Sequence, residues 1–254
     1  MIFLNSYILP DYADLLRLHQ LDNFKQLWDR PVDWFEAPNY RRGGWSGVAR
    51  INLTMNDKDH WLFIKKQENH GRWGLTSFPK KEPTFRREFD NLQYLKSKQF
   101  SAPKVVFYGE QLVDGKLCAI LITEELTGYS PLNQISEQFT QMGKSQKNEL
   151  LKNVALALRN FHQLNRMHRA LYPKHIFVAD LHTTPKTALI DFEKTRFSPF
   201  FWYNAYFDLA AFNRHVEGWS KSQKMFLFKQ YFKLGRLTWL TKVFYKCIML
   251  RSTR

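Results

Sequence analysis

Residues 60–65 are His60-Trp61-Leu62-Phe63-Ile64-Lys65, a mainly apolar run that ends on a lysine. They follow the turn signal Asn56-Asp57-Lys58-Asp59, so a hairpin is predicted, and its first strand comes from residues 41–53, a glycine-rich turn that runs into an alternating strand. A lysine at the end of a rigid strand can reach inward toward a phosphate, while alternation sends the adjacent Lys66 to the opposite face. The other interpretation of Lys65 is a strand-end cation that extends to water.

The glycine-rich segment at the start of this hairpin contains Gly43, Gly44, Ser46 and Gly47. Glycine lets backbone N–H groups approach phosphate oxygens closely. Glycine pairs also occur in ordinary turns. The segment therefore leaves both interpretations open.

A helix is predicted over residues 83–99, where apolar residues recur at helical spacing, as at Phe85, Phe89 and Leu92. Glu88 shares this apolar face and is expected to point inward. A buried carboxylate is costly unless it is paired. No residue three or four positions away on the helix is cationic, so Lys65 is the natural partner.

The rest of the chain contributes a hairpin around Asp114-Gly115, a helix over residues 146–164 and a short strand pair at residues 176–178 and 188–190. The remaining aromatic and basic residues are predicted to be helical. This order favours an α+β chain with two lobes. The small N-lobe, residues 1–126, has an antiparallel sheet and one key helix, and the C-lobe, residues 127–254, is mainly helical.

Asp191 directly follows the apolar run Ala188-Leu189-Ile190, which places a carboxylate at the end of a buried strand. Such a carboxylate could hold Mg²⁺, which prefers one or two carboxylates together with phosphate oxygens and water. The competing interpretation is a turn or helix cap.

Charge is concentrated in the second half of the 254-residue chain. Up to Leu126 there are 18 Lys and Arg against 16 Asp and Glu, whereas the remainder has 20 against 7 and carries most of the net charge of +15. Such a surface attracts nucleic acid, anionic membrane or a phosphorylated glycolipid, or it is a solvated face without a partner. Nucleic acid ranks last because no reading motif is present.

The remaining composition is typical of a folded cytosolic protein. With 44% apolar residues the chain can bury a sizeable core. Cys118 and Cys247 match no metal or disulfide spacing, which favours a reducing compartment. The start lacks the basic region of a signal peptide, and the apolar runs are far shorter than the roughly 18 residues of a membrane span.

Six segments combine into a more specific pattern. They are Gly43-Gly44-Trp45-Ser46, Phe63-Ile64-Lys65-Lys66-Gln67-Glu68-Asn69-His70, Pro83-Thr84-Phe85-Arg86-Arg87-Glu88-Phe89, Thr123-Glu124-Glu125-Leu126, Leu171-Tyr172-Pro173-Lys174-His175-Ile176-Phe177-Val178 and Leu189-Ile190-Asp191-Phe192-Glu193-Lys194. In this order, over roughly residues 40–215, the chain resembles the bacterial lipopolysaccharide-kinase families of the Kdo/WaaP type, especially their InaA-like branch. It also resembles the protein kinases more distantly.

The resemblance implies a protein-kinase-like fold and an ATP-dependent phosphotransferase that uses Mg²⁺ and phosphorylates a sugar of the lipopolysaccharide inner core, or another phosphate-rich glycolipid. Lys65 would bind phosphate beside its helix partner Glu88, together with the glycine-rich segment. Glu124, Glu125 and Leu126 would form the hinge that contacts adenine. Asp191 would be the metal-binding aspartate.

The sequence departs from the kinase pattern in the catalytic loop. Kinases have H-R-D-L-x-x-x-N, and this chain has His168-Arg169-Ala170-Leu171-Tyr172-Pro173-Lys174-His175. Ala170 replaces the catalytic aspartate and His175 replaces a metal-binding asparagine. Imidazole is a softer ligand than an amide oxygen, so His175 is expected either to bind the metal or to bond a phosphate or the backbone.

Loss of the aspartate leaves two functional hypotheses. A general base contributes about 10² to 10⁴ in rate, so positioning and charge neutralisation would still allow a slow kinase, and Glu193 or Asp180 could replace the base. The rival is a nucleotide-binding pseudokinase with a regulatory or stress-response role. By the same resemblance Asp208 braces the loop, unless it is a plain N-cap.

The basic tail, residues 221–254, interleaves aromatic residues with cations. It either contacts the anionic inner membrane peripherally or forms the last helices of the C-lobe, with the aromatic residues in the core and the cations outside.

Overall fold

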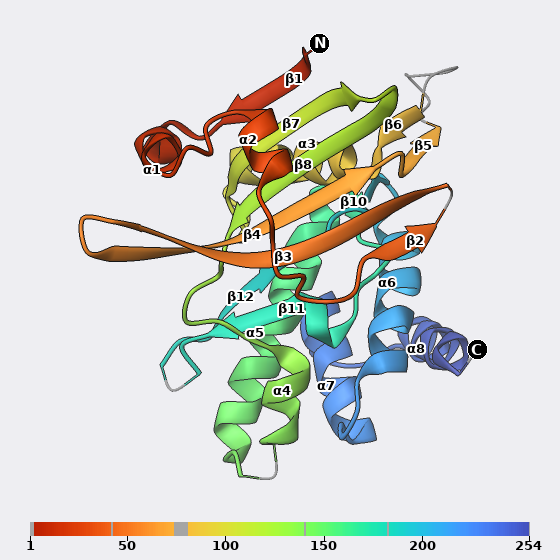
Figure 1. The fold of residues 1–254 in the computed structure, drawn as a ribbon. Coiled ribbons are helices and arrows are strands. Elements are labelled where there is room, and N and C mark those ends of the chain that lie inside the picture. The colour runs from red at the N-terminus through yellow and green to blue at the C-terminus, as the bar shows by residue number, and fades with distance from the viewer. Residues whose placement is uncertain (1–2, 42, 74–80, 140, 182, 254) are drawn as a thin grey trace. The chain divides into compact units, whose positions relative to one another are not determined.

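The computed structural model describes residues 3–41, 43–73, 81–139, 141–181 and 183–253 (Figure 1). The chain forms two compact units. The first comprises residues 1–98 and 103–125, and the second comprises residues 99–102 and 126–254. The division follows Glu125, one residue before the position expected from the sequence, and residues 99–102 belong with the second unit.

The first unit is built on a 6-stranded antiparallel sheet with the order β1-β7-β8-β4-β3-β2 (Figure 1). Its strands are β1 (Phe3–Ile8), β2 (Asn39–Arg41), β3 (Gly44–Met55), β4 (Lys58–Glu68), β7 (Val105–Val113) and β8 (Lys116–Glu124). The two predicted hairpins are present. Asn56 and Asp57 have positive φ, as a tight hairpin turn requires. A separate two-stranded sheet joins β5 (Gly71–Trp73) and β6 (Lys81–Pro83).

One face of the large sheet is covered by residues of the first thirty positions, including α1 (Ala13–Leu18) and α2 (Phe24–Asp29). Alternate residues of the strands face this core, such as Leu62 and Ile64 on β4. Lys66 follows the same alternation, and its Nζ donates to the carbonyls of Trp28 and Arg30, 3.0 and 2.7 Å away. Burial lowers the pKa of Lys66 to about 8. Lys66 therefore lies on the face opposite to Lys65, as predicted.

The second unit is mainly helical. Its helices are α4 (Leu132–Glu137), α5 (Lys144–Gln163), α6 (Phe201–His215), α7 (Lys221–Phe232) and α8 (Trp239–Ser252). Buried residues of α5 recur at helical spacing and include Leu151, Val154, Leu158 and Phe161. Helix α5 packs on α7, and α6 packs on α8. Within the described residues, no helix is long and apolar enough to cross a membrane.

Small sheets complete the second unit. β11 (Ile176–Ala179) pairs with β12 (Lys186–Leu189), as predicted, and also with the short β9 (Ser130–Pro131). β10 (Arg166–Met167) pairs with β13 (Arg196–Phe197). The candidate loop at residues 168–175 therefore lies between β10 and β11 in the chain, and Asp191 follows β12.

Candidate active site

The glycine-rich segment spans the end of the turn between β2 and β3 and the start of β3, the strand that contains Gly44, Ser46 and Gly47. Gly43 has a φ of +76°, a conformation that favours glycine. A Cβ on Gly44 would lie 2.1 Å from the carbonyl oxygen of Glu68, so the packing of β3 on β4 requires a glycine there. Arg42, the other residue between the two strands, lies outside the described residues. The two glycines thus have structural roles, and a phosphate contact by them or by half-buried Ser46 stays a prediction.

Lys65 on β4 and Glu88 on α3 (Thr84–Ser97) form the ion pair expected from the sequence. The Lys65 Nζ lies 2.7 and 2.8 Å from the two carboxylate oxygens of Glu88. The two side chains are only 18% and 4% exposed. Breaking a buried pair of this kind is costly, so the contact holds the Lys65 ammonium group in a fixed position.

Two further contacts fix α3 and were not predicted. The Gln67 Oε1 accepts hydrogen bonds from the backbone N–H of Phe85 and from the Thr84 hydroxyl, at 3.1 and 3.0 Å. It thereby satisfies a backbone donor in the first turn of the helix. Arg86 makes two bonds to the carboxylate of Glu110 on β7, at 2.7 and 2.8 Å. The contact of Gln67 with α3 could have been predicted from strand alternation, because alternation places Gln67 on the same face of β4 as Lys65.

The predicted hinge residues are tied into the first unit up to Glu125. The Glu124 carboxylate accepts from the Tyr12 hydroxyl, and the Glu125 carboxylate accepts from Arg50 at 2.8 and 3.0 Å. Their backbone N–H groups donate to the carbonyls of Lys104 and Trp61, at 2.9 and 3.0 Å. Because these two donors are already used, an adenine contact from this segment would have to use the carbonyls or the N–H of Leu126.

In the second unit, a buried carboxylate holds the backbone of the loop at residues 168–175. Asp208 lies inside α6. Its Oδ2 accepts from the N–H of His168 at 2.6 Å, and its Oδ1 accepts from the N–H of Arg169 at 2.8 Å. The latter residue has a φ of +65°, a strained conformation that persists only when its surroundings fix it. Asp208 is therefore the loop brace, and its place within the helix rules out the N-cap interpretation.

A hydrogen-bonded chain orients Asp208 itself. His162 Nε2 lies 3.0 Å from Asp208 Oδ2, and His162 Nδ1 lies 2.6 Å from the Tyr231 hydroxyl. Burial raises the pKa of Tyr231 well above its usual range, so the hydroxyl keeps its proton and donates to Nδ1. The Nε2–H then faces the carboxylate. Neither His162 nor Tyr231 was predicted, because their partners come from distant parts of the chain.

Replacing Asp208 with asparagine is expected to destabilise the second unit. An amide offers one acceptor where the carboxylate uses two, and unsatisfied buried donors cost about 1–3 kcal/mol each. We expect the free energy of unfolding to fall by about 3 kcal/mol, measured by urea denaturation. Glu217→Gln, an exposed substitution in the same unit, is the control and should change little. An unchanged Asp208→Asn variant would contradict the brace.

His168 connects the loop to the residue that precedes Asp191. Its ring is buried, and Nε2 lies 3.0 Å from the carbonyl oxygen of Ile190. A carbonyl only accepts, so Nε2 carries the hydrogen. Burial lowers the pKa of His168, which keeps the ring neutral. Phe192 packs beside it, with ring centroids 5.5 Å apart.

His175 and Asp191 form an unusual pair. The His175 Nδ1 lies 2.8 Å from the carbonyl oxygen of Ala170, so Nδ1 carries the hydrogen and Nε2 presents a lone pair. Burial lowers the pKa of His175 to about 4, which keeps that lone pair at neutral pH. Nε2 lies 3.5 Å from the Asp191 carboxylate. Two acceptors at this separation favour a cation between or beside them.

The donor set suits a metal ion carried by a phosphate ligand. A histidine whose other nitrogen bonds a carbonyl is the usual form of a metal-ligating imidazole. Among the described residues no group of three or more potential ligands occurs, and Mg²⁺ bound to a nucleotide needs only one or two from the protein. The tautomer also argues against a His175–phosphate hydrogen bond, because Nε2 has no hydrogen to donate.

Acidification is expected to destabilise the metal-free chain through His175. Its pKa is near 6.5 when unfolded and about 4 when folded, despite the nearby Asp191. Between these values the unfolded state binds more protons, so stability falls as the pH drops from 6.5 to 4, by about 3 kcal/mol in total. His175→Asn should lose correspondingly less over this range in urea titrations. Parallel curves for the two proteins would contradict this assignment.

The two carboxylates considered as substitutes for the missing base differ in position. Asp180 lies at the opposite end of the β11–β12 hairpin from Asp191, where it pairs with Lys186 at 2.9 Å. Asp191 lies five positions after Lys186, a separation of roughly 15 Å at strand spacing. The prediction for Asp180 was therefore wrong. Glu193 lies two residues from Asp191 in a turn, and Ala170 itself is buried.

Comparisons with known proteins identify the family of this chain. The sequence profile of the lipopolysaccharide kinase (Kdo/WaaP) family matches residues 25–231. Protein InaA of Escherichia coli (strain K12) is 32% identical over 180 residues, which cover 69% of this chain and 79% of that protein. A solved structure of WaaP in complex with acyl carrier protein superposes with a TM-score of 0.66 at 17% identity, over 91% of this chain and 89% of that chain.

Proposed function

The chain belongs to the lipopolysaccharide kinase (Kdo/WaaP) family and has its protein-kinase-like fold, and on this basis we propose that it is an ATP-dependent phosphotransferase. The acceptor is a hydroxyl group on a sugar of the lipopolysaccharide inner core. ATP and Mg²⁺ are the cofactors, and the reaction takes place in the cytoplasm, where ATP is available.

The observation that carries the proposal is the pair of acceptors on His175 and Asp191. A neutral Nε2 lone pair and a carboxylate 3.5 Å apart are suited to holding a divalent cation, which would neutralise the charge of the transferred phosphoryl group. The surrounding backbone is fixed by Asp208 and by the bond from His175 to Ala170. Such preorganisation is what phosphoryl transfer requires.

Lys65 supplies the second part of the proposed machinery. Its ammonium group, held by both oxygens of Glu88, is suited to binding the nucleotide phosphates. Gln67 and the Arg86–Glu110 pair keep α3 in register with the sheet. These contacts position Glu88, and through it Lys65.

Exposed cations around the loop support an anionic acceptor. Arg169, Lys194 and Arg196 have exposed side chains, and the guanidinium of Arg166 lies 5.6 Å from the centre of the exposed Phe197 ring. Arginine recognises carboxylate and phosphate groups with two hydrogen bonds. An exposed aromatic ring offers a flat surface to a sugar. Acidic or phosphorylated core sugars match both features.

Ala170 favours a second candidate, a nucleotide-binding pseudokinase with a regulatory role. The position of the general base carries no proton acceptor, and Asp180 is too far along its hairpin to replace it. Of Asp180 and Glu193, only Glu193 then remains a candidate to replace the general base. Nucleotide binding without turnover would follow from the same His175–Asp191 and Lys65–Glu88 pairs.

Transfer of labelled γ-phosphate from Mg-ATP to purified core oligosaccharide tests the proposal. The phosphotransferase predicts a labelled saccharide with the wild type and none with Asp191→Asn, which keeps the left-handed backbone that Asp191 adopts. Nucleotide binding with no labelled product would support the pseudokinase instead. Absence of both binding and product would contradict both candidates.

A further inference from the structure

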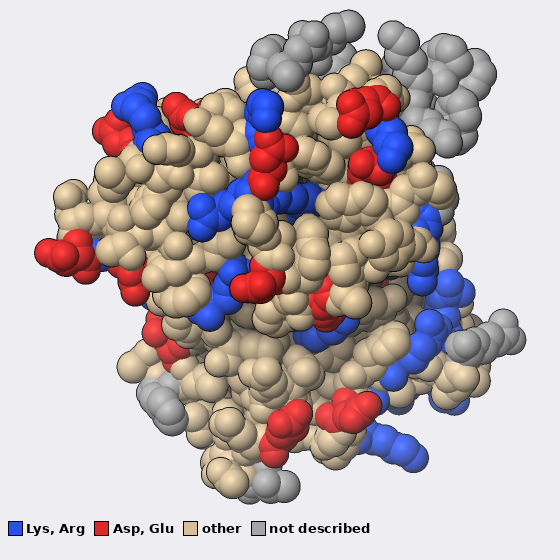
Figure 2. Space-filling view, viewed as in Figure 1, with Lys and Arg blue, Asp and Glu red and all other residues tan. Residues whose placement is uncertain are grey.

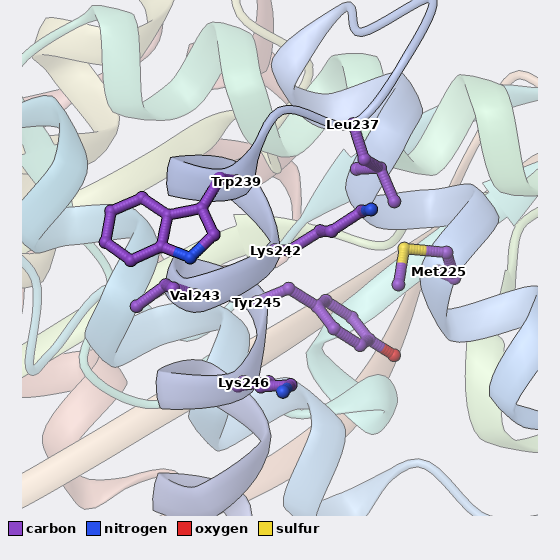
Figure 3. A pocket seen from close by; sticks show the side chains of 7 residues that line it. All are labelled: Met225, Leu237, Trp239, Lys242, Val243, Tyr245 and Lys246. Carbon is purple, nitrogen blue, oxygen red and sulfur yellow. The ribbon is translucent and has the colours of Figure 1, made fainter.

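Helix α8 presents an apolar face to solvent. Trp239, Leu240 and Leu250 are 73%, 70% and 68% exposed, and Val243 is also exposed. Residues 239, 243 and 250 lie on one side of a helix with 3.6 residues per turn, whereas buried Ile248 lies on the other. Figure 3 shows Trp239 and Val243 pointing to the same side. Contiguous exposed apolar surface of this kind marks an interaction site.

Shallow hollows extend this face along the helix. One, of about 420 Å³, is lined by Met225, Leu237 and Tyr245 together with Lys242 and Lys246 (Figure 3). A second, of about 380 Å³, continues past Tyr245 and Lys246 to Leu250. Apolar surface therefore runs along much of α8, with Lys242 at its border and Lys246 between Val243 and Leu250 on the same side.

The opposite side of α8 is firmly packed within the second unit. The Arg251 guanidinium lies 4.0 Å from the centre of the Phe207 ring, and the Arg251 carbonyl accepts from Arg214 at 3.0 Å. Phe244 packs edge-on against Trp202, with ring centroids 5.2 Å apart. The apolar face is therefore displayed by a fixed helix, and substitutions on it should leave the packing intact.

Charge distinguishes this part of the chain. Between Gly218 and the C-terminal Arg254 there are nine Lys and Arg and no Asp or Glu. Over much of the face drawn in Figure 2, acidic side chains are interspersed among basic ones. Lys242 and Lys246 are exposed on α8 beside the apolar residues. Long lysine side chains can cover apolar surface while their charge reaches a polar layer.

We propose that α8 docks the chain on an anionic lipid bilayer. Trp239, Leu240, Val243 and Leu250 enter the boundary between headgroups and acyl chains, and Lys242 and Lys246 contact lipid phosphates. An amphipathic helix with tryptophan and leucine beside lysine lies in the membrane interface in this way. The inference goes beyond the proposed catalysis, because it requires neither nucleotide nor turnover.

Charge also argues against two other occupants. A second copy placed by two-fold symmetry on the same face would bring the same cations together, with no acidic residue after Glu217 to offset them. Nucleic acid would use the cations but would leave the apolar face uncovered. An anionic bilayer satisfies both the charge and the apolar surface.

Vesicle cosedimentation with the full chain, without nucleotide, tests the proposal. The wild type should bind vesicles made of phosphatidylglycerol and phosphatidylethanolamine. Its binding to vesicles of phosphatidylcholine alone should be weaker by about tenfold or more. Leu240→Ser with Leu250→Ser should weaken binding by roughly tenfold or more. Lys242→Gln with Lys246→Gln should weaken it by about fivefold for each lysine.

The matched control replaces Leu18 and Phe35 with serine, since these are also highly exposed, at 62% and 66%, but lie in the first unit. It should bind like the wild type. Failure of the wild type to bind anionic vesicles would overturn the proposal, as would equal binding by the α8 variants. The face would instead be assigned to self-association by two results together. The wild type would not bind vesicles, and it would form a dimer in sedimentation velocity that the Leu240→Ser with Leu250→Ser variant does not form.

Cys247 provides an independent readout. It is a free, exposed cysteine on α8, whereas Cys118 is free and buried. An environment-sensitive fluorophore on Cys247 should shift its emission to shorter wavelengths when anionic vesicles are added, because the label enters a less polar layer. Vesicle binding without any shift would place the contact elsewhere on the chain and contradict the role of α8.

Discussion

Replacing Lys65 with methionine is expected to slow phosphoryl transfer by about two to three orders of magnitude and to destabilise the first unit. The substitution removes the ammonium group that contacts both oxygens of the 4% exposed Glu88 carboxylate. Breaking a buried ion pair from one side costs about 3–5 kcal/mol, and we expect about 3 kcal/mol because Lys65 is partly exposed. Lys65 is proposed to bind the nucleotide phosphates, and loss of such a preorganised charge costs about 10² to 10³ in rate. Urea denaturation and the phosphotransfer assay measure the two effects.

A double substitution separates these effects. Lys65→Met with Glu88→Leu removes both charges, so it should recover most of the lost stability without recovering turnover. Lys58→Met, an exposed lysine on the same strand, is the control and should match the wild type in both assays. A Lys65→Met protein with unchanged stability and turnover would contradict both the structural and the catalytic role of the pair.

Restoring an aspartate at position 170 is the second large expected effect. By comparison with the kinase catalytic-loop pattern, Ala170 stands where kinases have their aspartate, and a positioned base contributes about 10² to 10⁴ in rate. If the remaining site is competent, Ala170→Asp should raise turnover by roughly two orders of magnitude or more. Some stability should be lost, because Ala170 is buried and a buried carboxylate must be desolvated.

Ala170→Asn is the matched control for this substitution. It introduces nearly the same volume and hydrogen-bonding capacity but no carboxylate, so it should leave turnover at the wild-type level. Equal turnover of the Asp and Asn variants would show that the loop does not place residue 170 beside the reacting hydroxyl, and it would favour the pseudokinase.

Much of the ion-pair geometry was predictable from local rules. Helical spacing placed Glu88 on the buried face of α3, and the cost of burying a carboxylate then required a cation from elsewhere. Strand alternation separated Lys65 from Lys66 correctly. These inferences succeeded because they depend only on the periodicity of helices and strands and on the large cost of burying an unpaired carboxylate.

Other features depended on tertiary packing that a sequence pattern does not reveal. Strand β1 is identified by its pairing with β7 rather than by an apolar repeat. The position of Asp180 required the register of the β11–β12 hairpin. The aromatic residues of the last helices were expected in the core, but composition does not show what covers each of them, and Trp239 on α8 is exposed instead.

Isothermal titration of the full chain with Mg-ATP tests the central claim most directly. The wild type should bind, and Asp191→Asn should bind at least tenfold more weakly when Mg²⁺ is present, about 1.4 kcal/mol. Asp180→Asn is the control, since Asp180 also has a positive φ but lies at the other end of the hairpin, and it should bind like the wild type. A wild-type chain that gives no binding heat and no competition with labelled nucleotide would contradict the proposal that this chain binds Mg-ATP.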